Sequence, residues 1–332
     1  MNNPLPAYAA HTLALDERLR HALDATRHVA VQPQSAHIGA LVRGLDLSRP
    51  LSAGEVATVR AALLRWKVVF FREQPLDHHQ HVAFARQFGE LTVGHPVFGH
   101  VDGHPELYSI AKYRSANNGH GGQAEVRPWT GWHADVTAAH NPPAASILRG
   151  VTIPPYGGDT QWTNLAAAYA ALSEPLRRFV ATLRGEHRFS PPQGQTPSRA
   201  YQALVENNTL VTEHPLVTVH PETQEPVLYV SPGFLKRIVG LSGRESRVLL
   251  ELLWEHAVKA EFTVRFKWEP GSIAFWDNRS TAHVAPQDIF ALDFERQLYR
   301  ATLVGHVPSG LDGRPSTAIQ GDPVLAVHGA AY

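Results

Sequence analysis

The chain has 332 residues, 30 basic and 30 acidic side chains, 20 histidines and no cysteine. This length predicts one large domain or two small ones, with a core large enough to need no disulfides. The absence of cysteine excludes thiolate nucleophiles, zinc fingers and sulfur-ligated iron, so a metal would need histidine and carboxylate ligands. Zero net charge argues against nucleic-acid binding, and no run of about 18 apolar residues predicts a membrane span. Charged residues interrupt the first thirty positions, which excludes a signal peptide and favours a cytoplasmic protein.

The predicted elements are short and mostly strands. Residues 1–27 have helical spacing and predict a peripheral arm, and 28–50 predict strands and turns. Further helices are predicted at 52–65 with a Ser52–Glu55 capping box, 78–88, from 164, 173–183, and 242–256 with a Ser242–Glu245 box. Further strands are predicted at 67–72, 107–111, 144–150, 159–163, 216–220, 227–230 and 297–304, and 263–268 with 272–276 predict a hairpin.

Three segments read as irregular. They are a long loop over 113–130, a polar stretch over 190–213 that is a candidate lid, and a Pro/Gly-rich, loosely packed tail over 308–332. Many short strands without alternating strand–helix units predict a mostly β fold with helices. A β-sandwich or jelly-roll core flanked by helices fits this order best.

The segment Trp132-His133-Ala134-Asp135 is the first motif that could carry chemistry. Side chains two apart in an extended segment share a face, so His133 and Asp135 offer an imidazole and a carboxylate together. A distant second histidine would complete a 2-His-1-carboxylate triad, which suits non-haem Fe(II) oxygen chemistry. Because the chain has 20 histidines, such a pair also arises by chance, and the interpretation depends on other motifs.

A second motif is the pair Arg296 and Arg300, four residues apart in a strand-like run. Even spacing places both guanidinium groups on one face of a strand. Buried in a barrel, they would need anionic partners, because an unpaired buried charge is costly. Structural arginines paired with local acids are the alternative for each one in isolation.

Together the motifs resemble those of the taurine/2-oxoglutarate dioxygenase family, in family order over roughly residues 30–307. The matching segments are Ile38-Gly39-Ala40, Gly44-Leu45-Asp46-Leu47, Val68–Arg72, Phe88–Leu91, His95–Val97, Trp132–Thr137, Gly157–Thr163, Trp276–Arg279 and Tyr299–Thr302. The resemblance implies a double-stranded β-helix (jelly-roll) core. The dioxygenase domain would then span 28–307, between the N-terminal arm and the C-terminal tail.

The resemblance also implies the cofactors and their ligands. Fe(II) would be held by His133, Asp135 and His283, with 2-oxoglutarate and O₂ as co-substrates and succinate and CO₂ as products. Thr160 and Arg296 match the residues that contact 2-oxoglutarate, although Arg296 lies about two residues further from the distal histidine than is usual in the family. The carboxylate of Asp135 argues for hydroxylation or another outcome of hydrogen abstraction, since halogenating relatives lack it.

Five residues are expected to contact the substrate. Arg300 matches the position that grips the anionic head group in members that use sulfonates or sulfate esters, and His95 and Phe234 match other pocket residues. Phe98 replaces a tyrosine of the taurine enzyme, and Trp129 lies where that enzyme has an Asn/Asp-rich stretch. These aromatic side chains would add apolar surface, with core packing as the alternative for each. We therefore expect a mid-sized, largely apolar substrate with one anionic group.

Candidate substrates are an alkyl sulfate ester, an aryloxyalkanoate or a carboxylated secondary metabolite. The nearest alternative function is a sulfonate or alkyl sulfate ester dioxygenase of the taurine type. More remote alternatives are a Zn²⁺ hydrolase with the same ligands and a non-catalytic barrel that binds small anions. Family members associate as dimers or tetramers, but the sequence shows no interface stripe, so a homo-oligomer is one open alternative. Among the other histidines, His78, His79 and His81 are expected to be solvated.

Overall fold

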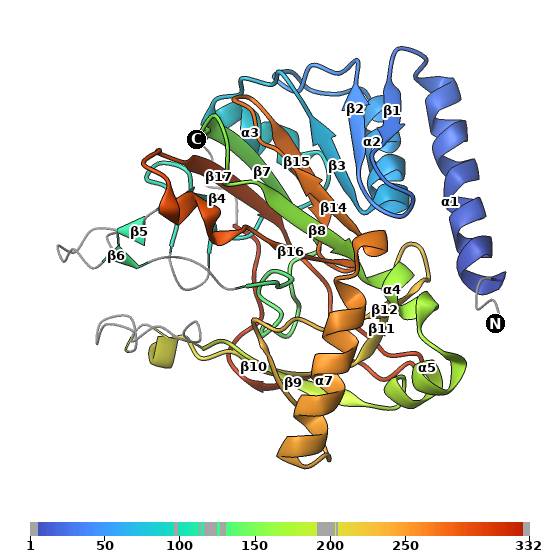
Figure 1. Ribbon diagram of the computed structural model, residues 1–332. Helices are drawn as coiled ribbons and strands as arrows, with labels where there is room; N and C mark the ends of the chain where they lie inside the picture. Colours follow the sequence, from blue (N-terminus) through green and yellow to red (C-terminus); the bar gives the residue numbers. More distant parts are fainter. Residues whose placement is uncertain are drawn as a thin grey trace.

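The structure is a computed structural model that describes residues 6–95, 99–112, 114–115, 125–126, 131–190, 203 and 205–327. Two β-sheets pack face to face, and helices cover the outer face of the larger one (Figure 1). A further sheet with its own helices lies below them in the same view. This arrangement confirms the predicted mostly β fold with flanking helices.

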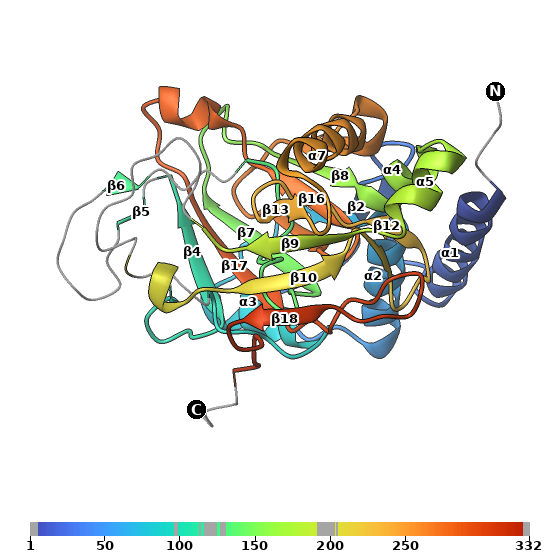
Figure 2. The ribbon, with the colours of Figure 1, turned by 90° about the horizontal axis from the view of Figure 1, so that it is seen from below.

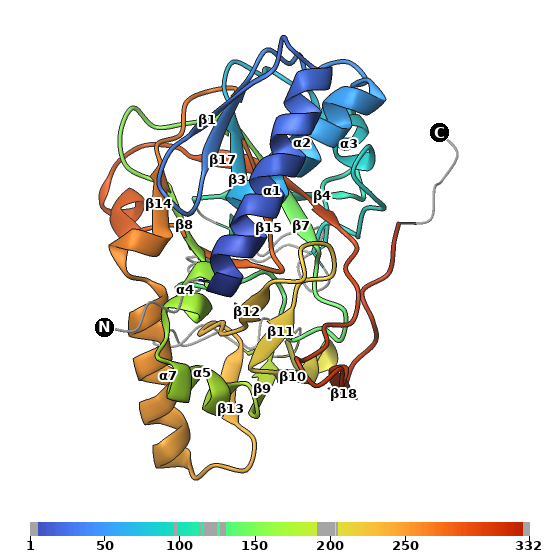
Figure 3. The same cartoon turned by 90° about the vertical axis from the view of Figure 1, so that its right-hand side faces the viewer.

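The larger sheet has seven strands in the described part of the chain. Their order is β1 (Ala30–Pro33), β2 (Ala40–Arg43), β3 (Val68–Phe71), β15 (Ile273–Asp277), β7 (Ala145–Thr152), β17 (Gln297–Leu303) and β4 (Leu107–Ala111). Only the β2–β3 pair among them is parallel. Three helices, α1 (Pro6–Ala25), α2 (Ala53–Trp66) and α3 (His78–Arg86), cover its outer face, with α1 lying along α2 (Figure 3).

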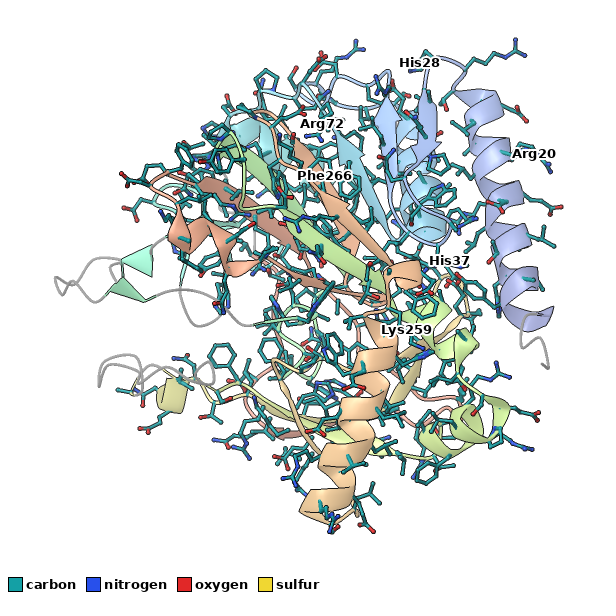
Figure 4. The ribbon with its side chains drawn as sticks, viewed as in Figure 1. Arg20, His28, His37, Arg72, Lys259 and Phe266 are labelled. Carbon is teal, nitrogen blue, oxygen red and sulfur yellow. The ribbon has the colours of Figure 1, made fainter. Side chains whose placement is uncertain are left out.

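The smaller sheet has the order β14 (Thr263–Phe266), β8 (Thr160–Asn164) and β16 (Thr281–Val284). Successive residues of a strand face opposite sides, so Phe71 packs under the helices while Phe70 points between the sheets. Phe70 stacks on Phe266 with ring centroids 4.1 Å apart. The guanidinium of Arg72 lies 4.1 Å from the same Phe266 ring, so both contacts tie β3 to β14 (Figure 4).

The third sheet has the order β13 (Leu235–Ile238), β9 (Arg184–Arg188), β10 (Val211–Pro215) and β18 (Thr317–Gln320). Figure 2 shows these four strands side by side. Its neighbours are the hairpin of β11 (Val217–Val219) and β12 (Pro226–Leu228), and the helices α4 (Leu165–Ala171), α5 (Glu174–Val180) and α7 (Gly243–Ala257). Short 3₁₀ helices η1 (Ala260–Phe262) and η2 (Gln287–Ala291) complete these elements. None of the described helices combines the length and apolarity needed to cross a membrane.

The predicted hairpin over 263–276 is wrong. Strand β14 pairs with β8, whereas β15 pairs with β3 and β7, so the turn carries the chain from one sheet to the other. Every residue of β15 is buried, while β14 alternates between buried and more exposed positions. A strand buried on both faces belongs in the middle of the larger sheet, and this requirement outweighs local pairing. Gly271, at φ +74°, provides the left-handed residue of the turn.

Other sequence expectations also need correction. Strand β9, with the sequence RGEHR, was not expected, and β10 begins inside the stretch predicted to be irregular. The tail is not loosely packed throughout, because β18 pairs with β10 and Ser316 is buried. Within the predicted 113–130 loop, the described residues form the short hairpin β5 (Arg114–Ser115) and β6 (Glu125–Val126). Residues 191–202 and 204 of the candidate lid lie outside the described residues.

One histidine predicted to be solvated is instead part of the core. His81 is fully buried in α3, and its Nε2 lies 3.1 Å from the carbonyl oxygen of Ile147. The run DHHQH that contains it has no apolar spacing to mark this position as buried. His78 is half-buried and His79 is exposed, so the prediction fails only for His81 among these three.

Candidate active site

His133, Asp135 and His283 converge at the edge of the smaller sheet. One ligand atom from each lies within 4.8 Å of the other two. The main chain explains this convergence, because the His133 N–H donates to the His283 carbonyl (2.9 Å) and the His283 N–H donates to the His133 carbonyl (2.7 Å). His133 thus pairs with β16 as an extra strand residue would. This pairing brings the distant histidine beside the H-x-D motif.

Hydrogen bonds fix the side chains of the first two residues. Nδ1 of His133 lies 2.8 Å from the carbonyl oxygen of Gly131, so Nδ1 carries the proton and Nε2 has the lone pair that a metal would need. Asp135 accepts a hydrogen bond from Ser146 on one oxygen and from Arg300 on the other. The next residue, Val136, has φ +45°, a conformation that is rare for a β-branched residue and turns the chain sharply after Asp135.

The protonation states suit a divalent cation. Burial raises the pKa of Asp135, but Arg300 and the two nearby imidazoles outweigh burial and hold the pKa below its usual range. Burial, reinforced by His133, lowers the pKa of His283 to about 3. At neutral pH Asp135 therefore offers a carboxylate and His283 a neutral imidazole, beside the imidazole of His133. Such a donor set fits Fe(II) and also catalytic Zn²⁺.

Thr160 and His283 share the interior face of the smaller sheet. His283 pairs with Trp162, and Thr160 lies two residues before Trp162 on β8, so all three side chains point the same way. The Thr160 hydroxyl accepts a hydrogen bond of 2.9 Å from Nε1 of Trp268. The structure thus places Thr160 on the face from which the triad histidine projects.

Arg296 is buried directly before β17, with 6% of its surface exposed. Its Nε donates to the carbonyl oxygen of Gly158 at 3.0 Å, and its terminal nitrogens bond to no side chain or carbonyl in the described part of the chain. Burial lowers its pKa to about 10, against the opposing influence of Asp288 and Asp159, so the guanidinium stays charged at neutral pH. Gly158 makes room for it, since a Cβ there would lie 2.9 Å from Cδ of Arg296.

An arc of aromatic side chains begins at His133. The ring of Phe234 lies 6.3 Å from that of His133, and the ring of Phe189 lies 6.1 Å from Phe234. The ring of His95 lies 6.1 Å from Phe189 and 5.0 Å from that of Tyr108. We call Phe234, Phe189, His95 and Tyr108 the aromatic arc. All four are buried.

Arg300 connects the far end of the aromatic arc to Asp135. Its guanidinium carbon lies 5.4 Å from the Tyr108 ring, and it donates a hydrogen bond to Asp135. The structure therefore brings together three of the predicted substrate residues, His95, Phe234 and Arg300. The other two predicted substrate residues, Phe98 and Trp129, lie outside the described residues.

Neither Tyr108 nor Phe189 was predicted from the sequence to be part of the site. Tyr108 lies opposite Arg300 in the β4–β17 register, and this pairing could not be inferred from either strand alone. Phe189 directly follows β9, and the polar sequence of β9 did not predict a strand there. For Tyr108 the sequence offered one signal. Alternation along the predicted strand 107–111 separates the side chains of its two faces, and so separates Tyr108 from its neighbours.

The chain matches a known family model along most of its length. Residues 30–302 match the model described as the taurine catabolism dioxygenase TauD, TfdA family. The chain belongs to this family. The predicted family, the jelly-roll fold and the enzyme class, a 2-oxoglutarate-dependent dioxygenase, are thereby confirmed.

Three similar proteins differ in what their names say they act on. The alpha-ketoglutarate-dependent sulfate ester dioxygenase of Pseudomonas putida is 38% identical over 326 residues, which are 95% of this chain and 98% of that protein. The alpha-ketoglutarate-dependent 2,4-dichlorophenoxyacetate dioxygenase of Cupriavidus pinatubonensis is 32% identical over 286 residues, 82% of this chain and 97% of that protein. A crystal structure of a taurine dioxygenase from Burkholderia xenovorans shares 67% identity and a TM-score of 0.77, covering 90% of this chain and 96% of that one.

Proposed function

We propose that this dioxygenase holds Fe(II) with His133, Asp135 and His283 and oxidises a mid-sized, largely apolar substrate that carries one anionic group. The observation that carries the proposal is the circuit from His133 through the aromatic arc to Arg300 and back to Asp135. It places apolar ring surface and one buried cation directly beside the proposed metal ligands. The expected cytoplasmic location and homo-oligomeric state belong to this proposal as well.

The residues divide the work between co-substrate and substrate. Arg296 and Thr160 would hold 2-oxoglutarate, since the unused terminal nitrogens of a buried guanidinium suit a carboxylate and a hydroxyl adds an orienting contact. When bound, Fe(II) supplies the activation of O₂ that couples decarboxylation of 2-oxoglutarate to oxidation of a substrate C–H bond. The protein contributes binding, orientation and the exclusion of water from the reacting atoms.

Arg300 and the aromatic arc would select the substrate. The guanidinium supplies donors to an anionic head group, and the rings of Phe189 and Phe234 supply apolar contacts to the rest of the molecule. An alkyl sulfate ester matches both features, and the name of the Pseudomonas putida relative supports it. Taurine, named for the Burkholderia xenovorans structure, ends in a short charged amine that such rings do not match.

A substrate panel tests this assignment. Purified enzyme is supplied with Fe(II), 2-oxoglutarate and O₂, and succinate is measured with hexyl sulfate, hexanesulfonate, an aryloxyacetate and taurine. We expect hexyl sulfate to give the highest kcat/KM. Fastest turnover of taurine would overturn the apolar substrate class, and fastest turnover of the aryloxyacetate would favour the aryloxyalkanoate alternative.

The metal assignment is tested separately. Anaerobic addition of Fe(II) and 2-oxoglutarate should give a visible charge-transfer band in the wild type and none in His133→Ala. Identical spectra for the two proteins would remove His133 from the metal site. Turnover that persists under strict anaerobiosis would favour the hydrolase alternative.

A further inference from the structure

A line of three hydrogen bonds runs behind Asp135 through the interior of the sandwich. Nε1 of Trp276 donates to Oδ1 of Asn278 at 2.7 Å, and Nδ2 of Asn278 donates to Oγ of Ser146 at 2.9 Å. The Ser146 hydroxyl in turn lies 2.7 Å from Oδ2 of Asp135. The four side chains are buried, with at most 3% of their surfaces exposed. We call Trp276, Asn278 and Ser146 the donor chain.

The chemistry of the groups fixes the direction of every bond. An indole N–H can only donate, so the amide oxygen of Asn278 faces Trp276 and its amino group faces Ser146. Since the Ser146 oxygen accepts from Asn278, its own proton is turned toward Asp135. The chain therefore ends on a carboxylate oxygen with a proton already supplied, which matches an ionised Asp135. Arg300 meets the other oxygen, so both positions of the carboxylate are held.

Trp276 also contacts a second proposed ligand. A histidine that binds a metal usually donates its other ring N–H to a carboxylate, carbonyl or water. Among the described residues His283 has no such partner, because its Nδ1 is buried without a hydrogen bond. Its ring lies against that of Trp276 instead, with centroids 4.9 Å apart and planes inclined at 57°. Packing on Trp276 thus takes the place of an acceptor in orienting His283.

The donor chain is built on rigid elements. Ser146 on β7 lies directly opposite Trp276 on β15, in the middle of the larger sheet. Asn278 follows β15, and its backbone N–H donates to the carbonyl of Ala144 at 3.0 Å. Central strands hold side chains more precisely than loops do. His133 and Asp135, in contrast, lie in a segment without helix or extended strand.

We propose that Trp276, Asn278 and Ser146 are positioning residues that orient Asp135 and His283 for the metal, an inference that rests on the metal site proposed above. Trp276 orients His283 by ring contact and acts on Asp135 through the other two. Neither contribution requires the donor chain to touch metal, co-substrate or substrate. Its loss should therefore appear first in the affinity of the metal-free protein for a divalent cation.

The test measures Mn²⁺ binding under anaerobic conditions, with free Mn²⁺ followed by electron paramagnetic resonance. Ser146→Ala removes the donor to Asp135 and should weaken Mn²⁺ binding by about 10–100-fold, the usual effect of removing a hydrogen bond to a metal ligand. Ser146→Thr keeps the hydroxyl and should restore most of the affinity. Ser280→Ala is the matched control, because the Ser280 hydroxyl is also buried and has no hydrogen-bond partner among the described residues.

A second pair of variants addresses the tryptophan. Trp276→Phe keeps an aromatic ring against His283 but removes the first donor, and should weaken Mn²⁺ binding less than Ser146→Ala does. Trp162→Phe is its control, since Nε1 of Trp162 is buried without a partner and its ring lies 5.6 Å from that of Trp276. Thermal melting with and without Mn²⁺ separates positioning from folding. A purely structural role would lower both midpoints equally, whereas positioning shrinks the rise caused by Mn²⁺.

The outcomes separate this inference from the proposed function. If the wild type does not bind Mn²⁺, the metal site itself fails and the positioning role fails with it. If the wild type binds Mn²⁺, and Ser146→Ala and Trp276→Phe each bind it as tightly as the wild type does, the donor chain has no positioning role while the metal site stands. If Ser146→Ala does not fold, the comparison of Trp276→Phe with Trp162→Phe decides.

Discussion

Arg300 stands at the junction between the proposed metal ligands and the aromatic arc. One of its terminal nitrogens donates to Asp135, its guanidinium lies over Tyr108, and its Nε is buried without a hydrogen-bond partner in the described part of the chain. Burying a donor without an acceptor is costly, so Nε of Arg300 would gain from a ligand that supplies an acceptor. The geometry therefore favours a ligand that reaches Arg300 while Asp135 keeps its own contact.

Replacing Arg300 should separate substrate from co-substrate binding. In Arg300→Leu we expect the affinity for an anionic substrate to fall about 10–100-fold, because hydrogen bonds to charged groups contribute about 1.5–3 kcal/mol. The affinity for 2-oxoglutarate should fall less. Both dissociation constants can be measured anaerobically from the Fe(II)–2-oxoglutarate absorption band. Arg296→Leu should give the opposite pattern, and equal losses in both variants would undo the division of roles between the two arginines.

Gly158 offers a second prediction, because a methyl group there would collide with Arg296. Its φ is +67°, and the added Cβ would lie 2.9 Å from Cδ and 3.0 Å from Nε of Arg296. Gly158→Ala should therefore displace the guanidinium and weaken 2-oxoglutarate binding at least tenfold, as roughly 1.4 kcal/mol would. Gly103→Ala is the control, since Gly103 has φ +74° and no atom within 4 Å of its added Cβ. Equal 2-oxoglutarate affinity in the two variants would contradict the role given to this glycine.

Elements defined by local chemistry could be predicted from the sequence, and elements defined by distant contacts could not. The capping boxes at Ser52 and Ser242 lie where they were predicted, because each needs only four consecutive residues. The polar strand β9 was missed because the strands that pair with it, β10 and β13, lie well beyond it in the chain. The candidate site divides in the same way. His133 and Asp135 form a local motif, His283 depended on the family resemblance, and Tyr108 and Phe189 depend on strand pairing.

At the end of α2, a buried ion pair ties the helix to β12. Lys67 adopts the left-handed conformation that ends α2, and its Nζ donates to the Leu64 carbonyl at 2.8 Å and pairs with Glu225. Both charged side chains are 2% exposed. Desolvation makes the net value of such a pair small, but removing one partner leaves an uncompensated buried charge.

Breaking this pair should destabilise the protein strongly. We expect Glu225→Gln to lower the free energy of unfolding by about 3–5 kcal/mol, measured by urea denaturation. The double variant Lys67→Met/Glu225→Leu removes both charges and should recover most of that loss. The exposed pair Arg178–Glu174 on α5 serves as the control, and Glu174→Gln should change stability little. A double variant as unstable as Glu225→Gln would show that the charges are not the cause.

At the scale of the whole molecule, the candidate site lies where the larger, the smaller and the third sheet meet. His133 and His283 belong to the edge of the smaller sheet, and Asp135 reaches β7 and β17 of the larger one through Ser146 and Arg300. Phe189 and Phe234 adjoin β9 and β13 of the third sheet. Chemistry and substrate selection therefore depend on the relative placement of the sheets, and a change in any one can alter both.

The buried histidines make the stability of the whole molecule depend on pH. His81 and His214 are fully buried, and burial lowers the pKa of each to about 3. In the unfolded chain both would titrate near the ordinary value of about 6.5. Between these values the unfolded state binds more protons than the folded state, so stability falls as the pH falls. Each such histidine should contribute a loss of about 1.4 kcal/mol per pH unit in that window.

The prediction is tested on metal-free protein by urea denaturation at pH 7 and pH 5. The wild type should be markedly less stable at pH 5. In His81→Gln, which cannot gain a proton, the difference between the two pH values should shrink by about 2 kcal/mol, whatever the variant's stability at pH 7. His21→Gln, at an exposed position on α1, should leave the difference unchanged. If His81→Gln loses as much stability as the wild type on acidification, then His81 must accept a proton in the folded state. Its contact with the Ile147 carbonyl would then persist in the charged form.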